Sequence, residues 1–201
     1  MLHTDERFHR SVEEAVTRIE KLTDAEIVVV AASRSGSYRD VSFAAASVVC
    51  LLTLILLVAI PYSIDPWLLI LDLVVSWGLA AWVASGHLFV RLLTSNKRRS
   101  HQVKTAAMAE FHRESVHATP QRTGVLIYVS GLEGQVQVLP DLGIQGRIPG
   151  PLWTRATQDF AHADLDHFVA GLDHMGELLG EHVPALEEDL VDLPNAPRVR
   201  A

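Results

Sequence analysis

The sequence predicts an α/β fold in which a small central sheet flanked by helices is interrupted by an inserted two-helix transmembrane hairpin. Two long runs of apolar residues, 41–60 and 67–93, contain almost no charge and predict the two helices of the hairpin. Two short runs rich in β-branched residues, 26–32 and 124–129, stand on opposite sides of the hairpin and predict buried strands. Because one helix and one strand cannot bury a core, we expect the strand before the hairpin to pair with strands after it.

The remaining elements follow from hydrophobic periodicity and from breaker residues. Residues 8–22 have the apolar spacing of an amphipathic helix. After the hairpin, the pattern predicts a helix at 101–116, strands at 124–129 and 135–139, and a loop rich in glycine and proline at 140–151. Two further helices are predicted at 152–161 and 164–179. We therefore expect one domain in two parts, 1–40 and 94–185, with the hairpin inserted between them at 41–93 and a flexible tail at 186–201.

Composition narrows the class of partner. The chain has 201 residues, of which 49% are hydrophobic, and a mean hydropathy of +0.21, because apolar residues gather in the two long runs. The formal net charge of -7 argues against nucleic acid as a partner, since binding a phosphate backbone needs clustered Lys and Arg. The only cysteine, Cys50, cannot form a disulfide within the chain. The polar N-terminal segment lacks a signal-peptide pattern, so we expect the first apolar run to act as an uncleaved anchor.

Basic residues near the ends of the apolar runs predict the orientation of the hairpin. Arg34 and Arg39 precede the first run, and the residues that follow the second run are Arg91, Lys97, Arg98, Arg99 and Lys104. The turn between the runs has no Lys or Arg and contains Asp65. Because Lys and Arg favour cytoplasmic loops, we expect a multi-pass protein of the inner (plasma) membrane with both termini in the cytoplasm.

Two groups of residues are expected to lie at the membrane interface. Tyr62 and Trp67 flank the turn, and amphipathic aromatic side chains of this kind favour the interface. Lys97, Arg98 and Arg99 form a basic patch beyond the second run, which predicts contact with anionic headgroups of the lipid bilayer.

One carboxylate, Asp72, lies within the second apolar run. An ionisable group inside a membrane is a functional candidate by default, for example in a proton relay. Asp72 is about one and a half turns from Trp67 by helix geometry, so it can also reach the interface or pair within the hairpin. Two helices without a partner cannot enclose a transport pathway, and we expect His87 to lie at the inner interface.

Short segments outside the hairpin follow one another in a particular order. They are Thr23-Asp24-Ala25-Glu26-Ile27-Val28-Val29-Val30, Thr123-Gly124-Val125-Leu126-Ile127-Tyr128-Val129-Ser130, Leu132-Glu133, Asp141-Leu142-Gly143-Ile144, Pro149 and Trp153. This succession resembles the TPM domain, a family named for thylakoid-lumen and phosphatase-like members. The resemblance covers nearly all of the chain outside the hairpin and the tail. It implies a small central sheet flanked by helices, and bacterial members of similar layout also carry a transmembrane hairpin.

The resemblance also implies functions. Some TPM members are described as acid phosphatases or calcium-binding proteins, with roles in the maintenance of membrane proteins. Most members place this domain outside the cytoplasm, whereas the charge bias of this sequence predicts a cytoplasmic domain.

Three carboxylates are candidates for a calcium or magnesium site, because both ions prefer oxygen ligands. Asp141 follows a predicted strand and begins a Gly/Pro-rich loop, and loops at strand ends commonly hold ligands. Glu26 or Glu133 would supply further oxygens. The alternative is that Asp141 caps a turn and that Glu26 pairs with Arg122 or with a backbone amide.

We assign no catalytic residue from the sequence. A phosphatase needs a nucleophile or a metal-activated water, together with cations that stabilise the phosphoryl oxygens. Ser33, Arg34, Ser35 and Arg39 lie near the end of the first strand and offer such groups. However, the sequence contains no CxxxxxR, DxDxT or Walker-type pattern.

The last predicted helix carries a further set of metal-binding side chains. His167, His174 and Glu177 are spaced by seven and three residues, which places neighbouring pairs on one helix face. This arrangement is compatible with a zinc site, although no HExxH pattern is present. The alternative is an ordinary solvated helix surface.

A complete fold without a catalytic constellation leads to a functional hypothesis. We expect a non-catalytic binding or scaffolding module, anchored in the membrane at its cytoplasmic face, which binds a protein partner or an ion. The alternatives are a divalent-metal-dependent phosphatase and a subunit of a larger membrane complex.

Overall fold

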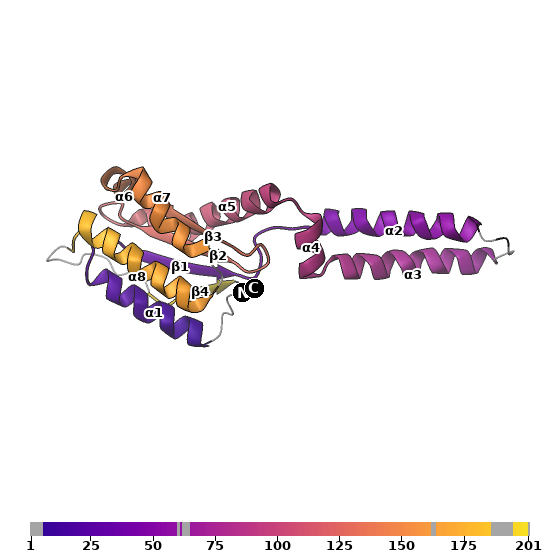
Figure 1. Cartoon of the computed structure of the whole chain (residues 1–201), viewed down its shortest axis with the longest axis horizontal. Coiled ribbons are helices and arrows are strands. Elements are labelled where there is room, and N and C mark those ends of the chain that lie inside the picture. The colour runs from indigo at the N-terminus through magenta and orange to yellow at the C-terminus, as the bar shows by residue number, and fades with distance from the viewer. Residues whose placement is uncertain (1–5, 60, 62–64, 162–163, 186–194, 201) are drawn as a thin grey trace. The chain divides into compact units, whose positions relative to one another are not determined.

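The computed structural model describes residues 6–59, 61, 65–161, 164–185 and 195–200. The chain forms two compact units. The first unit joins Met1–Ser35 to Ser100–Ala201 and contains the sheet, and the second, Gly36–Arg99, contains the apolar hairpin. Figure 1 labels the helices and strands of both units.

The first unit is an α/β fold, as predicted, with a mixed sheet in the order β3-β2-β1-β4. The strands are β1 (Ile27–Ala32), β2 (Val125–Ser130), β3 (Gln135–Pro140) and β4 (Arg198–Arg200). The helices are α1 (Glu6–Glu20), α5 (Asn96–Arg113), α6 (Leu142–Arg147), α7 (Gly150–Gln158) and α8 (Leu165–His182), with short 3-10 turns η1 (Val116–Ala118) and η2 (Asp159–Ala161). The first residues of α5, 96–99, belong to the second unit. β1 pairs in parallel with both β2 and β4, whereas β2 and β3 are antiparallel.

β1 is buried on both faces of the sheet, which explains its uninterrupted apolar sequence. Successive side chains of a strand point to opposite faces, so the residues of β1 alternate between two cores. Ile27, Val29 and Ala31 pack in the core that includes α1 and α8, and Val28 and Val30 pack in the smaller core that includes α5. In Figure 1, α1 and α8 lie side by side against the sheet. The pairing of β1 with β2 joins the segments before and after the hairpin, as predicted.

Two elements of the first unit are absent from the sequence-based prediction. β4 lies in the segment 186–201, which the sequence predicts to be a flexible tail and of which the structure describes 195–200. α6 occupies part of the predicted loop 140–151 and begins where the Asp141 side chain accepts a hydrogen bond from the amide of Leu142. A six-residue helix that contains two glycines has little intrinsic stability, so its cap and its surroundings must stabilise it.

The second unit consists of α2 (Arg39–Ala59), α3 (Pro66–Ala84) and the shorter α4 (His87–Leu93). α2 and α3 pack against each other and, with 21 and 19 residues, are long and apolar enough to cross a membrane. A core helix of a soluble protein can also meet this criterion, but it would be mostly buried. Here only 11% and 6% of the most apolar segments of α2 and α3 are buried, and large side chains such as Leu56 and Trp82 are exposed.

The structure divides the second apolar run, 67–93, at Ser85 and Gly86. Ser85 is the last residue near the helical conformation at the end of α3, and its hydroxyl donates a hydrogen bond to the carbonyl of Trp82 at 2.6 Å. The backbone of Gly86 is extended. The amide of Gly86 donates to the carbonyl of Val83 at 3.0 Å, and α4 begins directly after Gly86. The second long helix is therefore shorter than the run of apolar residues that predicts it.

Gly176 marks a close approach of α8 to α1. A β-carbon at this position would lie 2.6 Å from Cγ1 of Ile19, a buried β-branched side chain with little freedom to move. We expect Gly176→Ala to lower the free energy of unfolding by about 1–3 kcal/mol, because overpacking outweighs the ~1 kcal/mol by which alanine favours a helix. Thermal unfolding of the full chain in detergent, followed by circular dichroism, measures the effect.

Gly180→Ala is the matched control on the same helix. Its β-carbon would lie 3.4 Å from the carbonyl oxygen of Leu22, which is an ordinary contact distance. This substitution should leave stability unchanged or raise it by up to about 1 kcal/mol. Equal effects of the two substitutions would contradict the packing of α8 on α1 described here.

Candidate functional site

Polar side chains gather at the carboxyl ends of β1 and β2, the end of a parallel pair where ligands commonly bind. We name Ser35, Tyr128, Ser130 and Glu133 the Glu133 cluster. Ser130 and Glu133 are 1% and 3% exposed, and Ser35 is half-buried. The turn between β2 and β3 places Glu133 beside the end of β2, and the pairing of β1 with β2 brings Ser35 to the same place.

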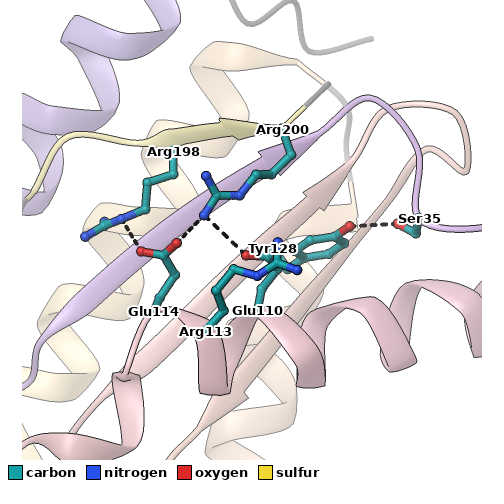
Figure 2. Close-up of polar contacts among 7 residues, drawn as sticks. All are labelled: Ser35, Glu110, Arg113, Glu114, Tyr128, Arg198 and Arg200. Atoms are coloured by element: carbon teal, nitrogen blue, oxygen red, sulfur yellow. Dashed lines mark hydrogen bonds and ion pairs between the residues drawn. The ribbon is translucent and has the colours of Figure 1, made fainter.

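Hydrogen bonds connect all four members of the Glu133 cluster. The Ser130 hydroxyl donates to the Glu133 carboxylate, and the Ser35 hydroxyl donates to Ser130 Oγ at 2.7 Å. The backbone amide of Ser35 also donates to the Glu133 carboxylate, at 3.1 Å from each oxygen. The hydroxyls of Ser35 and Tyr128 are 3.1 Å apart. Figure 2 marks this hydrogen bond with a dashed line. This network ties the loop after β1 to the turn after β2.

Tyr128 acts in this cluster as a neutral hydrogen-bonding group. Burial raises the pKa of its hydroxyl above the usual value near 10, and the hydrogen bond with Ser35, which acts in the opposite direction, does not cancel the effect of burial. The phenol is therefore protonated at neutral pH and is not a general base there.

A second set of charges connects the end of α5 to β4. We name Glu110, Arg113, Glu114, Arg198 and Arg200 the arginine–glutamate cluster, and Figure 2 shows all five. Arg198 and Arg200 share one face of β4, because alternate residues of a strand point the same way, and they extend toward the glutamates. Glu110 and Glu114 are one helical turn apart, so their carboxylates lie together.

The two carboxylates of this cluster are largely shielded from water. Arg198 Nε lies 2.5 Å from one carboxylate oxygen of Glu114. Arg200 contacts Glu114 and lies 3.5 Å from Glu110, which Arg113 approaches to 2.6 Å. The side chains of Glu110 and Glu114 are only 10% and 13% exposed, so salt screens these pairs less than it screens pairs on the surface.

The structure does not bring together the three carboxylates that the sequence suggests as calcium or magnesium ligands. Asp141 and Glu26 lie at the amino end of β2, where the amide of Asp141 donates to the carbonyl of Gly124 and the amide of Val125 donates to that of Glu26. Glu133 lies at the other end of the same strand. Within the described part of the chain, no three His, Cys, Asp or Glu side chains are grouped so as to hold a metal ion. Ion binding by Asp141 with Glu26 stays a prediction.

Asp141 is the partner of Arg122. Its carboxylate accepts two hydrogen bonds from the guanidinium, at 2.6 and 2.9 Å, and a third from the amide of Leu142 at 2.8 Å. Burial raises the pKa of Asp141, but the bonds from Arg122 and Leu142 outweigh burial and hold this pKa below its usual value. Arg122 has a left-handed backbone with φ of 59°, and a β-carbon at Gly143 would lie 2.6 Å from its carbonyl oxygen, so glycine is required at this approach.

The residues considered for phosphoryl chemistry do not form a group with the Glu133 cluster, except for Ser35. Ser33 and Arg34 are exposed beyond β1. Arg39 belongs to the second unit, where its guanidinium lies 5.7 Å from the centre of the Phe43 ring.

The residues predicted to contact the membrane interface belong to the second unit, and Tyr62 among them lies outside the described residues. Trp67 is 79% exposed in the first turn of α3. Lys97 is exposed and Arg99 is half-buried. Arg98 donates two hydrogen bonds to Asp40, at 2.8 and 2.9 Å, so part of its charge is balanced within the hairpin unit.

The histidines of α8 have separate carboxylate partners. His167 Nδ1 lies 3.1 Å from Asp164, and His174 Nδ1 lies 2.6 Å from Asp159. His174 and Glu177 line one surface cavity of about 310 Å³ between α7 and α8, and they share a helix face as predicted. Among the described residues, no third ligand joins them to complete a zinc site.

The arginine–glutamate cluster was not predicted from the sequence. Two signals for it exist: the spacing of Glu110 and Glu114 by one helical turn, and the alternation of Arg198, Val199 and Arg200, which is typical of a strand with one polar face. Arg200 and Glu114 are 86 positions apart. Neither signal identifies the segment that the other one contacts.

Comparisons with known proteins indicate the fold only. No protein-family model matches the chain, and no curated protein sequence matches it. A solved structure with a similar fold is the NMR structure of the BA42 protein from the psychrophilic bacterium Bizionia argentinensis. The two structures have a TM-score of 0.58 and 18% sequence identity, over 97% of this chain and 94% of the other. The chain therefore has a known fold, and an identity this low says nothing about its activity.

Replacing Asp141 with asparagine tests the contribution of its charge. Because the folded chain lowers the pKa of Asp141, the ionised carboxylate stabilises the fold above the unfolded pKa of about 4, and this stabilisation is lost as the pH falls through the folded value. We expect Asp141→Asn to lower the free energy of unfolding by about 1–2 kcal/mol at neutral pH. Urea unfolding of the full chain at a series of pH values measures the difference from the natural chain, which should shrink below about pH 4.

The control for this experiment is Asp173→Asn. Asp173 pairs with Arg18 at 2.8 Å, but both side chains are about half exposed, at 47% and 53%. An exposed pair of this kind contributes roughly 0–1 kcal/mol. An Asp141→Asn effect that is no larger than the control, or that persists undiminished in acid, would show that the Asp141 charge is not what stabilises this end of the sheet.

Proposed function

We propose that the chain is a membrane-anchored module of the TPM type, which binds a protein partner at the cytoplasmic face of the plasma membrane and does not catalyse a reaction. Three observations support the TPM assignment: the order of the sequence segments, their positions at β1, at β2 and at the start of α6, and the α/β fold of the first unit. The similarity to the BA42 structure supports the fold and gives no evidence for any activity of this chain.

The non-catalytic part of the proposal depends on one observation: the polar groups at the strand ends are buried and bonded to one another. Ser130 is 1% exposed and donates its hydrogen bond to Glu133. A nucleophile must reach its substrate, and a hydroxyl in this position cannot do so without rearrangement of the cluster. The Arg122 guanidinium, which would otherwise suit a phosphoryl oxygen, is bonded to Asp141. Such groups stabilise a scaffold more readily than they bind a reacting phosphate.

The proposed membrane anchor is formed by α2 and α3. Moving each large exposed apolar side chain from water into hydrocarbon is favourable by roughly 1.5–3 kcal/mol. The exposed Lys97 and the half-buried Arg99 suit anionic headgroups at one end of the hairpin. The segment between the two helices has no Lys or Arg, which supports cytoplasmic termini.

Asp72 favours a second candidate function, that of a subunit in a larger membrane complex. Its side chain is exposed on α3, next to exposed apolar side chains that include Leu71 and Val75. A carboxylate that faces hydrocarbon is costly, and a polar group on another transmembrane segment would stabilise it. A strictly monomeric mass in detergent would count against this candidate.

An assay with a phosphate ester tests the proposal that the chain is not an enzyme. We expect the purified full chain in detergent to hydrolyse p-nitrophenyl phosphate no faster than buffer does, with calcium, with magnesium or with a chelator. Asp141→Ala and the surface control Asp173→Ala should both leave this result unchanged. Turnover that Asp141→Ala abolishes and Asp173→Ala retains would overturn the proposal in favour of the divalent-metal-dependent phosphatase.

Labelling of single cysteines tests the proposed orientation. In a chain that carries Cys50→Ala, we expect Ser63→Cys to react with a membrane-impermeant maleimide from outside intact cells, because the turn faces outward. Ser37→Cys, which lies just before α2, is the control and should react only after lysis. The opposite pattern would place both termini outside the cytoplasm.

A further inference from the structure

β4 covers an edge of β1 that would otherwise be open. It pairs with β1 over three residues, with Arg198 opposite Val30 and Arg200 opposite Ala32. One further hydrogen bond runs from the amide of Ser33 to the carbonyl of Arg200, at 3.0 Å. A pairing this short gives few backbone hydrogen bonds, so β4 needs further interactions to stay in place.

The arginine–glutamate cluster supplies these interactions. Within the described residues, both ion pairs of Glu114 are with β4, one to Arg198 and one to Arg200. Glu110 is shared between Arg200 and Arg113, which lies on its own helix. If β4 left the edge, Glu114 would lose both guanidinium groups that pair with it, and Glu110 would lose one of its two partners. The edge of β1 therefore favours an occupant that carries positive charge.

The edge also favours one spacing of that charge. Val199 stands between the two arginines, and its side chain is 44% exposed. The occupant is thus bound through its backbone and through alternate side chains, while the side chain between them is left largely free. Binding by β-strand addition has the same features: hydrogen bonds of the paired backbones supply affinity, and alternate side chains supply specificity.

We propose that the edge of β1, together with Glu110 and Glu114, is a binding site for an extended segment of a partner protein with arginines at alternate positions. β4 is the internal segment that fills this site, and the partner competes with it. The inference rests on the proposed function as a binding module and names the chemistry of its partner. The support for this chemistry is that β4, the segment that occupies the edge of β1, carries arginines at alternate positions, and these arginines extend toward the two glutamates (Figure 2).

An internal occupant weakens the apparent affinity of a partner with the same chemistry. A tethered segment competes at an effective concentration on the order of millimolar when its linker is short and flexible. Removing the two guanidinium groups of β4 weakens this competitor and leaves both glutamates in place. The partner's affinity should then rise.

The test uses a fluorescent peptide with the sequence of residues 195–200 and the full chain in detergent, and it measures fluorescence anisotropy. We expect the Arg198→Ala/Arg200→Ala variant to bind the peptide at least about tenfold more tightly than the natural chain does. Adding Glu110→Gln and Glu114→Gln to this variant should abolish the gain. Higher salt should weaken the binding, because charge drives it.

Matched controls separate this site from general charge effects. Arg7→Ala/Arg18→Ala removes two exposed arginines of α1 and should bind the peptide no more tightly than the natural chain does. A peptide with glutamate in place of both arginines should not bind. Equal affinity of the natural chain and the β4 variant would overturn the proposal, and so would binding that persists without Glu110 and Glu114. A natural chain that forms dimers by exchanging β4 would also overturn it, because the occupant would then be a second copy.

A milder variant keeps the test decisive if the double variant does not fold, as judged by circular dichroism. Arg198→Ala retains Arg200 and its contacts with both glutamates, and it should give a smaller but measurable gain in affinity. The proposed function has its own test in the phosphate-ester assay. Turnover there would overturn the proposed function, whereas an absence of both turnover and peptide binding would overturn this inference alone.

Discussion

The parallel pairing of β1 with β2 is the interaction on which the rest of the first unit depends. β1 is the only described strand that precedes the hairpin, and six residues of it, from Ile27 to Ala32, stand opposite six residues of β2. This pairing gives the two cores a common sheet on which to pack, with α1 and α8 on one face and α5 on the other. It also brings Ser35 to Ser130 and exposes the edge that β4 covers. The Glu133 cluster and the arginine–glutamate cluster both follow from it.

The elements that could be predicted from the sequence are those whose stability comes from burial. β1 and β2 are covered on both faces, so each has a continuous apolar sequence that can be recognised without knowledge of its neighbours. α2 and α3 were predictable for a related reason, since their apolar side chains cover every direction around the helix. The break at Ser85 and Gly86 was missed, because a run of apolar residues shows where a helix can form and does not show where hydrogen bonds interrupt it.

The elements that could not be predicted are those stabilised by contacts between distant segments. β4 has three residues, of which two are arginines, and an alternation this short is not enough by itself to predict a strand. The glutamates that hold Arg198 and Arg200 lie on another element, and nothing in either segment identifies the other. For the same reason, the position of Asp141 and Glu133 at opposite ends of β2 could not be predicted from local sequence. Both were correctly recognised as polar residues at strand ends, but strand direction in the folded sheet decides which strand ends meet.

The position of the hairpin between β1 and β2 restricts how the chain can be made and how it can change. Paired residues such as Ile27 and Val125 are 98 positions apart (125 minus 27), so the sheet cannot close until the whole hairpin and α5 have been synthesised. If the hairpin lies in a membrane, β1 and β2 must be on the same side of the bilayer in order to pair, so the chain between them must cross the bilayer an even number of times. In the proposed membrane-anchored arrangement, loss of one helix of the pair would leave β1 and β2 on opposite sides of the bilayer. In that arrangement, transmembrane helices can be inserted between β1 and β2 only in pairs, because the two strands pair on one side of the bilayer.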